Sequence, residues 1–190
     1  MGRPAACSVL VAALLASLLA TLLPAGRAPA IDSEIHFGRA QAAYAAGKYE
    51  DALTEYEAAL KLTGEDAAVR NNRALCWLAL ARYDKAKEEA ERAIELDPKG
   101  GRYYLTLAAV QLASKPPDLK GARSNLLKGV KHLKRARDHE GLGNAYYNLG
   151  VIAQLRRKYE EARDDYRLAL EYDPANADAR EALRALSPED

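Results

Sequence analysis

The pattern of apolar and polar residues divides the chain into an apolar N-terminal segment and a longer mixed body. Val, Ala and Leu fill residues 9–23, interrupted only by Ser17 and Thr21. Residues 33–186 instead combine small apolar residues with charged residues of both signs. Where apolar residues recur every three or four positions, they predict helices that bury one face. The composition, rich in Ala and Leu and poor in Val and Ile after residue 30, also favours helices over strands.

The body repeats itself. Residues 48–52, 82–86 and 158–162 each read as a basic residue, Tyr, an acid, a variable residue and Ala. Seven residues after each closing Ala comes a second Ala, followed by Leu or Ile. Ala52 and Ala86 are 34 residues apart, and Asp-Pro ends two of the copies, at 97–98 and 173–174. Because Pro lacks an N–H and disfavours helix before it, these pairs predict helix ends.

This spacing resembles the tetratricopeptide repeat, a 34-residue helix–turn–helix unit. The last copy matches most densely, with Tyr146, Gly150, Tyr159, Ala162 and Pro174 at family positions. The resemblance implies an all-α fold, an α-solenoid of such units. Its expected parts are repeats at about 33–66, 67–100, 101–137 and 139–176, a capping helix at 177–186 and a tail at 187–190.

Small residues mark the points where paired helices should cross closely. They are Ala40, Ala74, Ala108 and Gly150 on the first helices and Ala52, Ala86, Ala122 and Ala162 on the second. The third copy departs from the pattern, with Pro116-Pro117 between its helices and no Asp-Pro at its end. We expect its second helix to begin after Asp118, a good N-cap, and to run to about Arg137, one turn longer than its counterparts.

Residues 1–30 are typical of a signal peptide. Arg3 precedes the apolar run, and Ala28-Pro29-Ala30 offers small residues where signal peptidase cleaves. We expect a mature start near Ile31 and a periplasmic or secreted protein. The alternative is an uncleaved anchor that ties the repeats to a membrane, although about 15 apolar residues are few for roughly 30 Å of hydrocarbon.

The charged residues bear on the class of partner, and the cysteines bear on whether a disulfide can form. The chain has 28 basic and 27 acidic residues, so nothing in its net charge points to nucleic acid. Cleavage would remove Cys7 and leave Cys76 as the single thiol, without an internal disulfide. Cys76 lies in the apolar run 74–78 and is expected to be buried and inert.

Catalytic and cofactor-binding patterns are missing from the sequence. His132 and His139 are seven residues apart, about 10 Å along one helix, which is too far to share a metal. Gly141 and Gly143 lack the third glycine and the preceding strand of a dinucleotide-binding loop, and a turn or loose helix start explains them better. We therefore expect no enzyme activity, no cofactor, no metal and no small-molecule substrate.

The resemblance implies that the first helices line a concave groove for an extended peptide or a helix of a partner protein. The implied groove residues are Phe37, Gln41, Tyr44, Asn71, Asn72, Leu75, Leu78, Arg102, Leu105, Thr106, Tyr147, Asn148, Val151 and Gln154. Some family members grip a C-terminal carboxylate with five Lys, Asn and Arg side chains. Only Asn72 and Arg102 fit that arrangement here, so we do not expect a carboxylate clamp.

A basic helix offers a second interpretation of the binding surface. Seven Lys and Arg residues crowd residues 120–137, beside a separate apolar stripe that includes Leu126 and Leu133. A solvated helix face is the simpler explanation. The sequence thus predicts a non-enzymatic, exported scaffold or assembly factor that binds a protein or peptide in its groove. The alternative is a membrane-associated adaptor that docks acidic partners through the basic helix.

Overall fold

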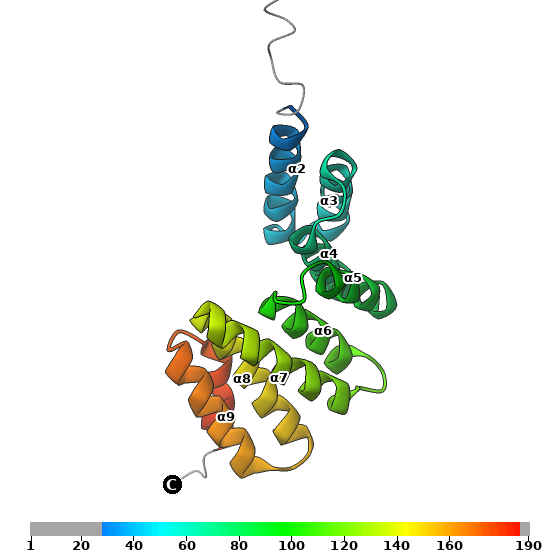
Figure 1. Ribbon diagram of the computed structural model, residues 1–190. Helices are drawn as coiled ribbons and strands as arrows, with labels where there is room; N and C mark the ends of the chain where they lie inside the picture. The colour runs from blue at the N-terminus through cyan, green and yellow to red at the C-terminus, as the bar shows by residue number, and fades with distance from the viewer. Residues whose placement is uncertain (1–27, 187–190) are drawn as a thin grey trace, which may run out of the picture.

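The computed structural model describes residues 28–186, and within this range the chain forms nine helices and no strand (Figure 1). Their bounds are α2 (Ala28–Ala45), α3 (Tyr49–Thr63), α4 (Ala67–Ala79), α5 (Tyr83–Leu96), α6 (Gly101–Ala113), α7 (Leu119–Ala136), α8 (His139–Leu155), α9 (Tyr159–Tyr172) and α10 (Ala177–Ala185). Nearly all of the expected signal peptide and the whole expected tail lie outside the described residues. Residues 28–30 of that signal peptide form the start of α2.

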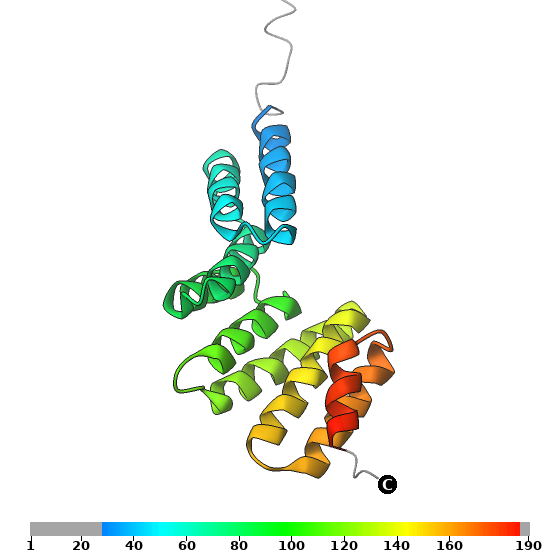
Figure 2. The same ribbon diagram turned by 180° about the vertical axis from the view of Figure 1, so that it is seen from behind.

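Consecutive helices pair into hairpins, which are α2–α3, α4–α5, α6–α7 and α8–α9, and α10 packs against α9. Each hairpin contacts the next through its second helix, and α6 also contacts the first helices α4 and α8. Figures 1 and 2 show the hairpins following one another from α2 at one end of the molecule to α10 at the other. The predicted all-α solenoid is therefore confirmed.

The helix ends follow the chemistry of single residues. α5 ends at Leu96 and α9 at Tyr172, each directly before an Asp-Pro pair. The Asp118 carboxylate accepts a hydrogen bond from the Gly121 N–H at 2.8 Å and caps α7, as expected. α7 has 18 residues against 14 in α5 and in α9, which matches the predicted extra turn.

The small residues lie where the helices cross. Ala86 and Ala162 are fully buried, as are the other alanines expected at the crossings. A Cβ atom added to Gly150 would lie 2.5 Å from a ring carbon of Tyr166, so only glycine fits beside that ring. Tyr56 and Tyr166 fill the space next to these crossings. Cys76 is fully buried, and burial raises the pKa of its thiol to about 11.

Two sequence expectations need correction at the start of α8. His139 begins α8 while His132 lies in α7, so the two do not share a helix. His132 stacks on Tyr104, with ring centroids 5.5 Å apart, and is half-buried. Gly141 and Gly143 do begin a helix, but the helix is tightly packed. A Cβ at Gly143 would lie 2.5 Å from that of Asp173.

A charged network joins α3, α4 and α5. Glu89 of α5 is only 8% exposed, and its carboxylate pairs with Arg70 and with Arg73 of α4, each at 3.0 Å. Arg73 also reaches Glu57 of α3 at 2.8 Å, and Arg70 reaches Glu65 at 2.6 Å. A carboxylate so deeply placed needs these partners, because burying an unpaired charge costs several kcal/mol.

Among the helices of residues 28–186, none combines the length and the hydropathy that crossing a membrane requires.

Candidate peptide-binding groove

The residues expected in the groove all lie on first helices, as the family resemblance implied. They come from α2, α4, α6 and α8, and α6 lies between α4 and α8. The structure nevertheless separates them into exposed and buried members. The exposed members are Gln41 and Tyr44 on α2, Arg102 on α6 and Gln154 on α8.

A hollow between the first and second hairpins is lined entirely by side chains from α2, α3 and α4. Four expected residues line it, Gln41 and Tyr44 from α2 and Asn72 and Leu75 from α4, together with Tyr56 of α3. Its volume is about 170 Å³. The repeat pattern indicates Tyr56 only as a core residue. It is indeed buried, and its ring also closes the hollow. We call these five residues the α2–α4 pocket.

No residue of the α2–α4 pocket carries a charge near neutral pH. Burial raises the pKa of Tyr56 to about 12, and burial also raises the pKa of Tyr44. Both phenols therefore stay protonated. The pocket offers apolar ring and leucine surface beside the amide groups of Gln41 and Asn72. This chemistry suits an apolar side chain whose own backbone bonds to the amides.

Phe37 contributes to the core more than to a free surface. Its ring packs edge-on against Tyr56, with centroids 5.7 Å apart, and it borders the buried cluster around Ala40 and Val69. Leu78 and Leu105 are half-buried as well. Leu105 packs towards α7, where a Cβ at Gly129 would come within 2.6 Å of its Cδ1 atom.

Asn71 and Thr106 are corrections to the expected site. They are 8% and 6% exposed, and the Thr106 hydroxyl donates to the Arg102 carbonyl at 3.3 Å. Neither presents a free surface to a partner. Both belong to helix positions that turn towards a neighbouring helix in this protein, and the repeat spacing alone does not distinguish such a position from a groove position.

Arg102 is exposed but already paired. Its guanidinium donates to both carboxylate oxygens of Asp138, at 2.6 and 2.8 Å, and to Glu140 at 2.9 Å. Arg102 holds the pKa of Asp138 below its usual range, with a smaller contribution from the Gly141 N–H. Asp138 also caps α8 by accepting that N–H at 2.9 Å. Arg102 thus fastens α6 to the start of α8.

At the other end of the solenoid, α10 covers part of the expected groove. Tyr147 and Val151 pack against the cluster of Ala153, Ala162 and Tyr166, which Ala182, Leu183 and Leu186 also border. Gln154 accepts a hydrogen bond from the Tyr166 hydroxyl at 2.8 Å. The Asn148 amide donates to the Asn144 carbonyl at 2.9 Å. Val151 and Gln154 still line an open hollow of about 510 Å³ with Leu155, Arg157 and Tyr159.

Between residues 28 and 186, no three His, Cys, Asp or Glu side chains are grouped so that they could hold a metal ion. His36 bonds Glu55 instead, with Nδ1 and Oε2 2.6 Å apart.

Known proteins share both the sequence pattern and the fold. The heat-shock protein cognate (HSC) co-chaperone sgt12 of Aspergillus fumigatus is 30% identical over 141 residues, which is 73% of this chain and 38% of that protein. The Hsp70-Hsp90 organizing protein of Triticum aestivum is 26% identical over 137 residues, 72% of this chain and 16% of that protein. This chain spans only a minor part of the length of these relatives.

A solved structure has the same fold. The thermophilic TPR protein TTC0263 of Thermus thermophilus superimposes with a TM-score of 0.70 at 21% identity, covering 81% of this chain and 80% of that one. Models of the tetratricopeptide repeat match residues 37–101, which span most of the first two hairpins, and residues 143–176, which span the fourth. The chain belongs to the tetratricopeptide-repeat family.

Proposed function

We propose that this protein is a non-enzymatic scaffold that holds an extended peptide segment of a partner protein against its first helices. The observation that carries the proposal is the α2–α4 pocket. It places Gln41, Tyr44, Asn72 and Leu75 around one hollow that has apolar walls and an amide rim. A peptide there would insert one apolar side chain, while Gln41 and Asn72 bond its backbone.

The relatives support a role in protein interactions. One is named an organizing protein for Hsp70 and Hsp90, and another is named a co-chaperone. Both names describe proteins that act together with other proteins. The present chain need not share their partners, because Phe37 and Thr106 stand where a carboxylate clamp requires charged side chains.

We also propose that the protein acts in the periplasm or outside the cell, after removal of residues 1–30. The proposal rests on Arg3, the apolar run 9–23 and the small residues at 28–30. The mature protein would start near Ile31 and would keep all of the groove residues.

A peptide library tests the groove. Phage that display random twelve-residue peptides are selected on the immobilised protein, and the selected peptides are measured by titration calorimetry. We expect micromolar dissociation constants, about 8 kcal/mol in all. Leu75→Ser and Asn72→Ala should each weaken binding about five- to thirtyfold, because each removes one anchor.

Leu62→Ser is the matched control. Leu62 of α3 is 39% exposed and lies outside the pocket, so its loss should leave the affinity unchanged. Circular dichroism melts establish that all three variants stay folded. Peptides that bind the Leu75 and Asn72 variants as tightly as the parent would place the binding surface elsewhere and refute the proposal.

A further inference from the structure

The exposed face of α7 carries a concentration of positive charge. Seven basic residues and no acid lie between residues 119 and 137. They are Lys120, Arg123, Lys128, Lys131, Lys134, Arg135 and Arg137, and all are exposed. The rest of the chain contains 21 basic residues and 27 acidic residues. The nearly neutral net charge therefore conceals a strong separation of charge along the chain.

Most of these cations have no carboxylate partner in the described part of the chain. Arg123 pairs with Glu161 at 3.6 Å, and Lys134 lies 5.8 Å from the centre of the Tyr146 ring. Within residues 28–186 the other five form no ion pair. The basic residues of α4 differ sharply, since Arg70 and Arg73 are each bonded to two carboxylates.

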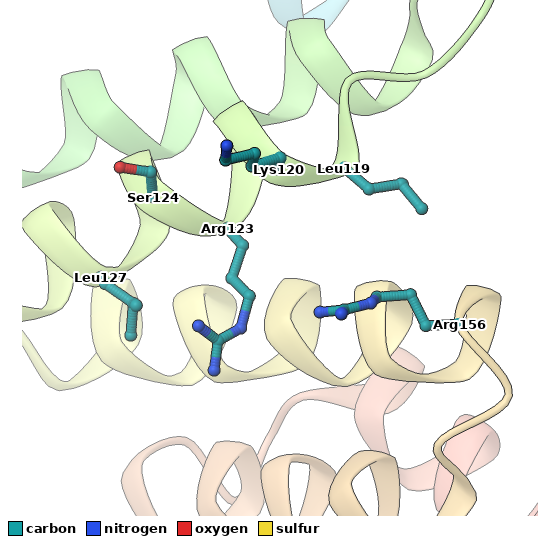
Figure 3. A pocket seen from close by; sticks show the side chains of 6 residues that line it. All are labelled: Leu119, Lys120, Arg123, Ser124, Leu127 and Arg156. Atoms are coloured by element: carbon teal, nitrogen blue, oxygen red, sulfur yellow. The ribbon is translucent and has the colours of Figure 1, made fainter.

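A hollow of about 530 Å³ opens at the N-terminal end of this face. Lys120, Arg123, Ser124 and two leucines of α7 line it, together with Arg156 from the end of α8. In Figure 3 the Arg156 side chain extends along α8 towards the guanidinium of Arg123. The hollow thus brings three cations and a hydroxyl together from two hairpins. We call Leu119, Lys120, Arg123, Ser124, Leu127 and Arg156 the α7 basic pocket.

Glu161, the acid that pairs with Arg123 of the α7 basic pocket, is already bonded to a second cation. Glu161 bonds Lys158 at 2.8 Å in addition to Arg123. Lys158 lowers the pKa of Glu161 most, followed by Arg123 and Arg156, which places all three cations around one carboxylate. Asp165 also lies near enough to Arg123 for that cation to oppose the rise of its pKa. Lys120, Arg123, Arg156 and Lys158 still outnumber these two acids, which leaves capacity for an anion from outside.

We propose that the α7 basic pocket is a second docking site, distinct from the groove, for a short acidic segment of a partner protein. Arginine forks match carboxylate oxygens in pairs, and Lys120 and Ser124 can supply further donors. Leu127 is 46% exposed at the edge of the pocket and offers contact for one apolar side chain of that segment. The volume lies within the usual range of ligand-binding pockets, roughly 300–1,000 Å³.

A short peptide fits this surface better than an extended polyanion does. A lipid surface or a nucleic acid would reach past α7 and meet the rest of the chain, which carries more acids than bases. Helices that insert into a bilayer interface need several large apolar residues, whereas Leu127 is the one large apolar side chain exposed on α7. A segment of a few Asp and Glu residues around one Leu avoids both difficulties.

Fluorescence anisotropy tests the proposal with a synthetic twelve-residue peptide of Asp and Glu around a central Leu. Its matched control replaces every Asp by Asn and every Glu by Gln. We expect the acidic peptide to bind and the amide peptide not to bind. Arg123→Gln with Arg156→Gln should raise the dissociation constant at least about tenfold, because two charge-assisted contacts are lost.

Two further variants separate this site from the groove and from a general response to net charge. Lys61→Gln with Lys87→Gln removes the same charge from exposed positions on α3 and α5, and should change the affinity less than about twofold. Leu75→Ser alters the groove and should leave acidic-peptide binding intact, so the two proposals can fail independently. If both double variants weaken binding equally, the peptide responds to net charge only and the site is refuted.

The alternative occupants give their own signals. Binding of phosphatidylserine vesicles that Arg123→Gln with Arg156→Gln abolishes, without binding of the acidic peptide, would identify a membrane surface and overturn the proposal. A molar mass in light scattering that rises with protein concentration, and that the same variant returns to the monomer, would identify a second copy of the chain and also overturn it.

Discussion

At the scale of single residues, the tight turns inside the first, second and fourth hairpins require a left-handed backbone. Gly47, Ala81 and Arg157 stand two residues before Tyr49, Tyr83 and Tyr159, and their φ angles are 72°, 55° and 58°. In each turn the next N–H reaches back to a helix carbonyl, for example from Arg82 to Trp77 at 2.8 Å. Glycine adopts this conformation without the steric cost that a Cβ adds.

Two glycine substitutions should therefore have opposite effects on the free energy of unfolding. Gly47→Ala places a Cβ at φ 72° and should destabilise the protein by about 1 kcal/mol. Gly38→Ala lies inside α2, where an added Cβ meets nothing within 4 Å, and should stabilise it by roughly 0.5–1 kcal/mol. Urea unfolding measures both. Equal shifts in one direction would contradict the assignment of the turn.

Asp165 should make stability depend on pH. Burial, followed by the neighbouring Glu161, raises its pKa from 3.8 to about 6, while Arg123 opposes the shift. The folded state then binds a proton as the pH falls through about 6, whereas the unfolded chain binds it only near 3.8. Through this group alone, stability rises as the pH falls from 7 towards 4.

Asp165→Asn should consequently be more stable than the parent at pH 7.5. The gain is at most about 1 kcal/mol, because solvent screens a half-exposed carboxylate. The gap should narrow as the pH falls below about 6 and close only towards pH 4, as urea titrations at a series of pH values would show. Asp164→Asn, at the exposed neighbouring position, serves as the control and should show a smaller dependence. A gap that widens on acidification would reverse the sign assigned to Asp165.

The residue scale also shows what sequence reasoning reaches. The buried alanines at the crossings followed from their spacing, because each repeat uses the same contact. The repeat spacing did not predict that Asn71 and Thr106 are buried or that Arg102 is ion-paired. Arg102 pairs with Asp138 and Glu140, which come after the irregular third hairpin. Beyond that hairpin the spacing no longer tells which side chains meet. The α7 basic pocket depends on Arg156, whose approach to Arg123 is visible only in three dimensions.

At the scale of helices, Glu89 holds α4 against α5. Glu89→Gln leaves Arg70 and Arg73 with a neutral partner in a largely buried place, and should cost about 3 kcal/mol. Glu88→Gln changes the exposed neighbouring carboxylate and should cost less than about 0.5 kcal/mol. Thermal melts of both variants measure the difference. Equal melting temperatures would show that the network adds nothing to stability.

Helix α10 should protect the end of the solenoid. Deleting residues 177–190 exposes Tyr147, Val151 and the cluster around Tyr166. Coupling between neighbouring units then predicts loss of hydrogen-exchange protection in α8 and α9, with α2 and α3 least affected. Because Tyr147 lies against α10, substituting it would disturb this contact as well as any groove function. Uniform protection in the shortened protein would contradict the capping role.

The element scale was the most predictable from sequence. The Tyr-x-x-Ala motifs mark where α5 and α9 begin, and the Asp-Pro pairs mark where they end. Asp118 likewise predicts the start of α7. The exception was α2, which begins at Ala28 within the expected signal peptide. There the apolar run at residues 9–23 was the stronger pattern and hid the start of the helix.

At the scale of the whole molecule, the proposed export would determine which surfaces are available to a partner. If residues 1–30 are a signal peptide, N-terminal sequencing of the protein from the periplasm or medium should begin at or near Ile31. Expression with Ala28→Leu and Ala30→Leu should leave the precursor uncleaved, because large residues block the peptidase site. An intact N-terminus in the membrane fraction of the parent would instead favour the anchored form.

The separation of charge between α7 and the rest of the chain has a consequence for rates. Coulomb attraction acts over a Debye length of about 8 Å at physiological salt, whereas apolar side chains attract only on contact. An acidic partner would be steered to α7 before any other surface touches it. Its association rate should then fall as salt is added, while its dissociation from the uncharged α2–α4 pocket should scarcely change. If one partner uses both proposed sites, α7 would govern how fast that partner arrives and the α2–α4 pocket would govern how long it stays.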